Sequence, residues 1–259
     1  MRKLLLATAL LLLPALALAA ENPWLGTWKL NVAKSKFSGG TFTITKLENG
    51  LHHFSDGSTT EFDFGIDGKE YPTGDGYSVI WTTAGDNAWD LVGKLNGKVV
   101  VNQRVQISAD GKTLNLQING TKPDGSPFHD EIVHTRMTGT TGLVGKWKST
   151  KVNISVPDTM VVSSPSEGVL RWEYPHDKAT MEGKLDGTDL PSTGPQVPDG
   201  VTQAFKVLSP GKLSYTVKVK GKTEGLGVQT LSGDGKTLTD VSWSPGKESE
   251  KSTAVYEKQ

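Results

Sequence analysis

The sequence predicts an all-β chain made of two tandem copies of one antiparallel up-and-down β-barrel. Three observations predict it: a Gly-x-Trp-Lys phrase occurs twice, apolar and polar residues alternate in short runs, and Asn-Gly and Asp-Gly dipeptides recur along the chain. The alternation is the period of half-buried strands, and these dipeptides favour the type I′ turns that join antiparallel neighbours. We expect barrels because closing a sheet on itself removes its exposed edges.

The chain begins with a segment typical of a secretory signal. A basic pair follows the first methionine, an apolar run continues to about Leu18, and small residues stand at Ala17 and Ala19. This order predicts a signal peptide over 1–19 that is cleaved after Ala19, and the run is too short to favour a membrane anchor. We therefore expect a periplasmic or secreted protein without membrane insertion.

The composition excludes several classes of protein and partner. The sequence has no cysteine, so it forms no disulfide, carries no lipid-modified cysteine and offers no thiolate metal site. Removing the signal peptide leaves 26 basic against 28 acidic residues, a net charge near −2. No basic stripe remains, which argues against nucleic acid as a partner. The oligomeric state is not indicated.

Matching phrases in the same order divide the rest of the chain into two copies. We predict one barrel over 22–138 and one over 143–259, joined by a Thr/Gly-rich connector, so that a cut at 138–143 gives two folded halves. The offset between copies grows from 119 to 124 residues, which indicates a single loop insertion. The matching phrases are GTW at 26–28 with GKW at 145–147, DGKEYP at 67–72 with DGTDLP at 186–191, and SADGKTL at 108–114 with SGDGKTL at 232–238.

Individual strands show the expected alternation. In the run from 212 to 220, Leu213, Tyr215 and Val217 fall on one side and lysine, serine and threonine residues on the other. Outside the signal, no segment sustains a helical period beyond a single turn at 32–37. Each copy is therefore expected to be a meander of short strands.

The Gly-x-Trp phrase on a first strand, followed by hairpins and an arginine in the last strand, resembles the lipocalin (calycin) pattern. The phrases GTWKLNVAKSKF, DGKEYP, SADGKTL and VYEKQ are similar to those of small bacterial exported lipocalin-like proteins, most of them uncharacterised. The resemblance implies two lipocalin-like barrels, each with a tryptophan plugging its closed end and a basic side chain across the indole ring. The implied plug residues are Gly26, Trp28 and Arg136 in the first copy, and Gly145, Trp147 and Lys258 in the second.

Bulky residues expected to face the barrel interiors are the candidate ligand-binding residues. An eight-stranded barrel either fills its interior with side chains or holds one small ligand, and alternation alone leaves both interpretations open. The candidates are Phe62, Phe64, Trp81 and Trp89 in the first copy, and Trp172 and Tyr215 in the second.

No catalytic, metal-binding or cofactor motif is recognised. The chain has no Gly-x-Ser-x-Gly, no His-Glu-x-x-His and no phosphate loop. The histidines at 52 and 53 diverge along a strand, and so do His129 and His134. Turn chemistry accounts for the paired acids of DGKEYP and DGTDLP. We therefore expect no catalytic residue, no metal and no cofactor.

Two functions fit these observations. The first is an exported, non-enzymatic binding protein that takes a small hydrophobic molecule in a barrel or between the barrels. The second is a structural or interaction module of the cell envelope, with solid barrels and no ligand. Since an enzyme needs convergent ionisable groups, a carrier an apolar cavity and a structural module no cavity, the barrel interior discriminates among them. We favour the binding protein.

Overall fold

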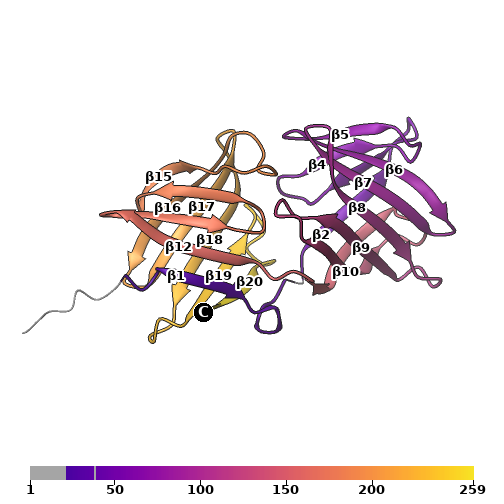
Figure 1. Ribbon diagram of the computed structural model, residues 1–259. Helices are drawn as coiled ribbons and strands as arrows, with labels where there is room; N and C mark the ends of the chain where they lie inside the picture. The colour runs from indigo at the N-terminus through magenta and orange to yellow at the C-terminus, as the bar shows by residue number, and fades with distance from the viewer. Residues whose placement is uncertain (1–21, 38) are drawn as a thin grey trace, which may run out of the picture.

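The computed structural model describes residues 22–37 and 39–259, and the expected signal peptide lies outside them. Twenty strands form two antiparallel sheets of ten strands each, with one short 3-10 turn, η1 (Val32–Lys34), among the described residues. Both sheets curl into nearly closed barrels that lie side by side (Figure 1). The all-β, two-barrel prediction is confirmed. Each barrel has ten strands.

The first barrel is one continuous stretch of chain, residues 41–153. Within this sheet, β11 lies between β10 and β2, and the outermost strands are β4 and β5. Its strands are β2 (Thr41–Lys46), β3 (His52–Ser55), β4 (Glu61–Phe64), β5 (Glu70–Gly74), β6 (Tyr77–Gly85), β7 (Ala88–Leu95), β8 (Lys98–Ile107), β9 (Thr113–Thr121), β10 (Pro127–Thr138) and β11 (Gly145–Asn153).

The second barrel combines the first strand of the chain with the last nine. Strand β1 lies between β12 and β20, where Thr27 is opposite Val161 and Lys29 is opposite Glu257. Its strands are β1 (Gly26–Leu30), β12 (Thr159–Ser166), β13 (Val169–Tyr174), β14 (Ala179–Gly183), β15 (Asp186–Pro191), β16 (Val201–Ser209), β17 (Lys212–Val219), β18 (Lys222–Leu231), β19 (Thr237–Trp243) and β20 (Ser252–Lys258).

The two barrels therefore do not coincide with the two sequence repeats. Strand β1 begins the repeat 22–138 but completes the second barrel, whereas β11 begins the repeat 143–259 but completes the first. The Thr/Gly-rich segment is not a connector between domains; it forms the tight loop of the β10–β11 hairpin. Because consecutive strands joined by a short loop pair most readily, β11 stays beside β10, and β1 fills the equivalent place in the other barrel. The first barrel is in effect inserted between β1 and β12.

Type I′ turns hold the hairpins, as the dipeptides predict. Asn96 and Gly97, between β7 and β8, both have positive φ angles, of 49° and 77°. Lys220 and Gly221 repeat this conformation in the second barrel, at 49° and 82°. A turn with two positive φ values matches the twist of antiparallel strands, so the hairpin register is set locally.

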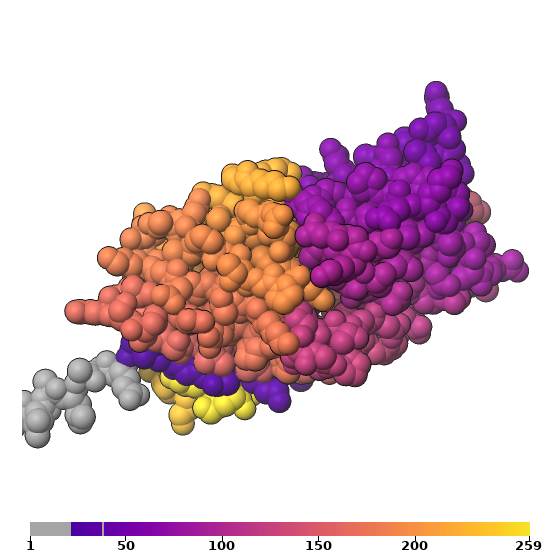
Figure 2. Space-filling view, turned by 45° about the horizontal axis from the view of Figure 1, so that its top comes forward, coloured from indigo at the N-terminus to yellow at the C-terminus, as the bar shows by residue number. Residues whose placement is uncertain are grey.

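The two barrels are joined by polar contacts between distant segments. The backbone N–H of Thr41 and its hydroxyl both bond to the Glu250 carboxylate, at 3.0 and 2.9 Å. The Ser58 hydroxyl donates to the Pro245 carbonyl oxygen at 2.9 Å. Figure 2 shows the surfaces of the barrels in direct contact along this boundary. Among the described residues there is no helix that is both long and apolar enough to cross a membrane.

Candidate functional site

A tryptophan closes one end of the first barrel, but its partner comes from the other repeat. Trp147 is fully buried and donates from Nε1 to the Leu143 carbonyl oxygen at 2.9 Å. The Arg136 guanidinium lies 4.1 Å from the centre of the indole ring. The expected pairing of Arg136 with Trp28 is thus replaced by one with Trp147, because Arg136 and Trp147 are direct register partners on β10 and β11.

The second barrel has the corresponding plug. Trp28 is fully buried, and the Lys258 Nζ lies 5.3 Å from the centre of its ring. Gly26 and Gly145 precede the two tryptophans with φ angles of +131° and +142°. A side chain at Gly145 would collide with the Thr138 carbonyl oxygen, so glycine is required where β11 leaves the hairpin loop. The six plug residues named from the sequence therefore come together at two buried tryptophans, with each tryptophan paired with the basic residue of the other repeat.

The interior of the first barrel contains a partly open cavity of about 450 Å³. Most of its wall consists of inward-facing apolar side chains from β2 to β10, in agreement with the alternation of the strands. Aromatic rings supply one part of the wall, and aliphatic side chains supply most of the rest. The aromatic residues are Phe42, Phe54, Phe62, Tyr77 and Trp81, and the aliphatic ones include Val79, Leu91, Val105, Leu116 and Ile132.

Three phenylalanines form a continuous aromatic wall. Phe42 stacks on Phe54 with ring centres 5.4 Å apart, and Phe54 stacks on Phe62 at 5.0 Å. The second pair is fixed by register, because Phe54 and Phe62 are opposite one another on β3 and β4. Such a wall offers a flat apolar surface on which a ring or chain can pack.

Two polar side chains belong to the same wall. His134 and Trp81 are each 7% exposed. The His134 Nδ1 and the Trp81 Nε1 find no hydrogen-bond partner among the described residues. Burial lowers the pKa of His134 to about 4, so its ring is neutral at pH 7. The cavity is therefore uncharged, with a small number of polar atoms.

The ligand-binding candidates in the first copy fall into two groups. Phe62 and Trp81 line the cavity. Phe64 is fully buried and stacks on Trp81 with ring centres 4.8 Å apart, so it is a packing residue of the core beside the cavity. Trp89 packs against the same core without lining the cavity.

The core of the second barrel is packed around Trp172, and a pocket of about 380 Å³ lies beside it, lined by residues that include Tyr174, Met181 and Gln203. Trp172 stacks almost parallel on Phe205, at 4.4 Å and 6°, and both are nearly fully buried. Trp172 is thus a packing residue. Tyr215 packs against the same core, with its ring centre 6.0 Å from that of Phe205, and it also lines a depression of about 380 Å³ that includes Thr41 and Glu250 of the two barrels.

An inward-facing carboxylate distinguishes the second barrel further. Asp240 accepts hydrogen bonds from the Tyr215 hydroxyl at 2.8 Å and from the Gln229 Nε2 at 2.9 Å. Burial raises the pKa of Asp240 above its usual value. Asp240 was not singled out from the sequence. Its position two residues after the buried Leu238 on β19 could have indicated that its side chain faces the barrel interior.

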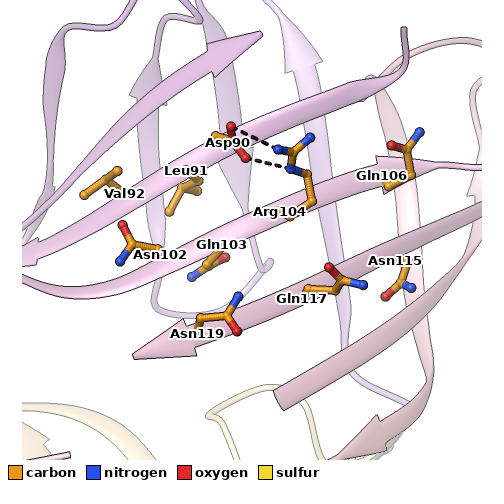
Figure 3. Close-up of a pocket in the computed structure, with 10 residues that line it drawn as sticks. All are labelled: Asp90, Leu91, Val92, Asn102, Gln103, Arg104, Gln106, Asn115, Gln117 and Asn119. Atoms are coloured by element: carbon orange, nitrogen blue, oxygen red, sulfur yellow. Dashed lines mark hydrogen bonds and ion pairs between the residues drawn. The ribbon is translucent and has the colours of Figure 1, made fainter. Parts of the chain in front are cut away.

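The outer face of the first barrel carries a polar depression across β7, β8 and β9. Figure 3 shows a row of amide side chains on this face, beside an ion pair in which the Arg104 Nε lies 2.7 Å from the Asp90 Oδ1. The amides on the outer face are Asn102, Gln106, Asn115, Gln117 and Asn119. Because this depression is an open part of the sheet surface, it offers a ligand less burial than the interior cavity.

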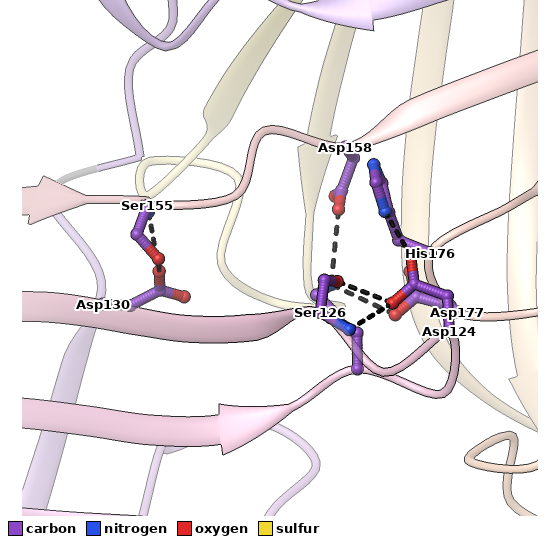
Figure 4. A network of polar contacts seen from close by, with 8 residues as sticks. Asp124, Ser126, Asp130, Ser155, Asp158, His176 and Asp177 are labelled. Atoms are coloured by element: carbon purple, nitrogen blue, oxygen red, sulfur yellow. Dashed lines mark hydrogen bonds and ion pairs between the residues drawn. The ribbon is translucent and has the colours of Figure 1, made fainter.

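A serine, a histidine and three aspartates meet between the barrels, but not as a catalytic triad (Figure 4). The Asp124 carboxylate accepts from the Ser126 hydroxyl at 2.6 Å and contacts the His176 Nδ1 at 2.7 Å. A nucleophilic serine needs the histidine on its own hydroxyl, whereas here the carboxylate lies between them. Lys122 extends the network to Asp177 at 3.1 Å, so these residues join the barrels.

The histidines that were considered as metal ligands do not come together at one site. His129 is exposed and bonded to Asn119 at 2.5 Å, whereas His134 is buried in the cavity wall. His53 pairs with Asp63 at 2.7 Å, and His52 stacks on Phe64. Within residues 22–37 and 39–259, no three His, Asp or Glu side chains come together as a metal site.

No protein-family model matches this chain, and no curated protein matches it. A function therefore has to be inferred from the chemistry of its own cavities.

Proposed function

We propose that this protein is an exported, non-enzymatic binding protein that takes a small apolar molecule into the cavity of the first barrel. The observation that carries the proposal is the cavity of about 450 Å³ in the barrel interior, with walls that are mainly aromatic and aliphatic. This volume falls within the range of about 300–1,000 Å³ that is typical of small-molecule sites. Removal of a ligand's apolar surface from water supplies the driving force.

The cavity favours a carrier over a solid structural module. Atoms that line an empty space lose the dispersion contacts that close packing provides, so a hollow barrel is less stable than a filled one. A ligand that fills the space restores those contacts. The second barrel, with Trp172 packed on Phe205, fits the structural alternative, and we propose that it acts as a packed partner to the first.

The route into the cavity runs between β4 and β5. These strands are the two edges of the first sheet, and no ladder joins them in the described structure. A surface groove at this position shares Phe62 and Thr73 with the cavity wall. Since no backbone hydrogen bonds have to break there, movement of a few side chains opens the barrel.

Export is the other part of the proposal. The expected signal peptide at 1–19 and the resemblance to exported lipocalin-like proteins support a periplasmic or secreted carrier. With no cysteine in the sequence, such a carrier holds its barrels by core packing and strand pairing alone.

A fluorescence titration tests the binding function. N-phenyl-1-naphthylamine, an uncharged apolar fluorophore, should bind the mature protein saturably, with one molecule per chain. Val79→Trp fills the cavity from β6 and should weaken binding at least about tenfold. Val99→Trp, the same change at a position 54% exposed, is the matched control and should leave binding unchanged.

The proposal fails if the probe does not bind, or if both tryptophan variants bind it like the parent chain. Circular dichroism establishes that each variant is folded. Should Val79→Trp not fold, Leu116→Phe, a smaller change in the same wall, takes its place.

A further inference from the structure

The depression on the outer face of the first barrel is lined by cross-strand pairs of polar side chains. It has a volume of about 750 Å³ and lies across β7, β8 and β9. Because alternate residues of a strand face the same side, three successive pairs on β8 and β9 form one continuous polar surface. The pairs are Asn102 with Asn119, Arg104 with Gln117, and Gln106 with Asn115.

The second barrel has apolar and β-branched residues at the same positions. At the offset of 124 residues between the later repeat phrases, each polar pair has a counterpart in β18 and β19 with the same pairing. Asparagine is depleted in strands, whereas valine, threonine and tryptophan are enriched, so strand formation does not explain the amides of the first barrel. The counterparts are Leu226 with Trp243, Val228 with Val241, and Thr230 with Thr239.

Two of the amides are free to bind a ligand. Asn102 and Gln117 are exposed, and neither side chain is hydrogen-bonded to another described residue. The neighbouring asparagines are held by β10, since the Asn115 Nδ2 donates to Glu131 at 2.9 Å and Asn119 contacts the ring of His129. A ligand can therefore engage Asn102 and Gln117 without breaking a contact within the protein.

The depression carries no net charge. Among the described residues that line it, Arg104 and Asp90 are the charged ones, and they form an ion pair with Nε to Oδ1 at 2.7 Å and Nη2 to Oδ2 at 3.3 Å (Figure 3). A nucleic acid or another polyanion finds no uncompensated positive charge here, although such ligands depend on one. An uncharged ligand complements this surface.

An uncharged molecule rich in hydroxyl groups matches the hydrogen-bonding capacity of the surface. A side-chain amide has two N–H donors and a carbonyl acceptor, and a hydroxyl both donates and accepts, so one amide can serve two neighbouring hydroxyls. A protein partner matches less well, because the centres of protein interfaces are enriched in aromatic residues and methionine. The described residues of the depression include neither, and the apolar ones are Leu91 and Val92.

We propose that the outer face of the first barrel is a second binding site, which takes a neutral saccharide chain through the amides of Asn102 and Gln117 and the guanidinium of Arg104. The site is separate from the apolar cavity, because Arg104 lies on the face of β8 opposite to Val105, which lines the cavity. Since the depression is open, binding depends on several hydroxyl groups along the chain.

A printed array of neutral and anionic oligosaccharides tests the proposal. Fluorescently labelled mature protein should bind neutral saccharides. Asn102→Leu combined with Gln117→Val introduces the residues found at the matching positions of the second barrel. This double variant should bind the same saccharides at least about tenfold more weakly, as the loss of two hydrogen bonds implies.

Thr45→Val is the control, because it replaces an exposed polar residue of the same barrel on β2, outside the depression. It should bind saccharides like the parent protein. Circular dichroism establishes that each variant is folded. Should the double variant not fold, Asn102→Ala combined with Gln117→Ala takes its place.

The proposal is overturned if no neutral saccharide binds, if binding is confined to anionic saccharides, or if the double variant binds like the parent protein. Titration of the same variants with N-phenyl-1-naphthylamine keeps the two sites apart. The double variant should retain the parent's affinity for this probe, because the probe occupies the cavity. A protein that binds saccharides but not the probe would retain this site and lose the function proposed for the cavity.

Discussion

The guanidinium of Arg136 lies 4.1 Å from the centre of the Trp147 ring, although the two residues belong to different sequence repeats. The same crossing places Lys258, the last strand's basic residue in the second repeat, over Trp28 of the first. Each plug therefore needs both repeats. The crossing couples the ends of the chain, since β1 is held between β12 and β20.

Replacement of Arg136 should destabilise the first barrel more than replacement of Lys258 destabilises the second. The Arg136 side chain donates to the carbonyl oxygens of Val144 at 2.8 Å and Gly142 at 2.6 Å, besides covering the indole ring. Loss of a cation–π contact and of charged hydrogen bonds predicts a decrease of about 2–4 kcal/mol in the free energy of unfolding for Arg136→Ala.

Lys258→Ala is the matched variant, with an expected decrease below about 1 kcal/mol, because its Nζ is 5.3 Å from the Trp28 ring centre and exposed. Urea denaturation measures both. Equal decreases for the two variants would contradict the unequal roles assigned to them.

Fragment 39–156 should fold by itself, because it contains all ten strands of the first barrel. It should unfold cooperatively and bind the fluorescent probe with the affinity of the whole protein. Fragment 22–138 lacks β11 and can close its barrel only if β1 moves into the vacant place. The prediction is contradicted if 22–138 is folded and binds the probe while 39–156 is unfolded by circular dichroism.

The fold class was predictable from the sequence, but the exchange of β1 and β11 was not. Alternation and positive-φ turns such as Asn96-Gly97 are local properties, so they are visible in the residues. The two first strands, GTWKL and GKWKS, are so similar that either suits either barrel. Which barrel each one joins depends on loop lengths and on the pairing of β10 with β11.

The candidate site was predictable only in part. The alternation along the strands predicted that Phe62 and Trp81 face the barrel interior, and both line the cavity. The same reasoning selected Trp172, which instead packs directly against Phe205. Strand alternation states which side chains point inward, and the distances between facing walls decide whether they meet. The sequence offered His134 only as a possible metal ligand, whereas its burial against Phe42 shows its place in the cavity wall.

Acid should destabilise the first barrel through His134. Its pKa is lowered from 6.5 to about 4 by burial, so the unfolded chain binds a proton that the folded chain does not. The stabilisation is complete above pH 6.5 and is lost as the pH falls towards 4, by about 3 kcal/mol in all.

His134→Phe removes this titration and should flatten the dependence of the free energy of unfolding on pH between 6.5 and 4. His53→Phe, at a half-exposed histidine of the same barrel, serves as control. Urea denaturation at pH 7 and pH 4.5 gives the difference. An unchanged pH dependence in His134→Phe would show that other groups govern acid sensitivity.

A larger side chain at the gap between β4 and β5 should slow the entry and release of the ligand. Thr73 belongs both to the surface groove and to the cavity wall, and it is half-buried on an edge strand without a neighbour across the gap in the described structure. Thr73→Trp should therefore reduce the association and dissociation rates of N-phenyl-1-naphthylamine together, by about tenfold, while the equilibrium affinity changes less. Stopped-flow fluorescence measures both rates.

Lys98→Trp is the control, because it introduces the same side chain at an exposed position at the start of β8. It should leave both rates unaltered. If Thr73→Trp exchanges the probe as fast as the parent protein, the ligand enters elsewhere, and the unpaired edges of β4 and β5 are not the entrance.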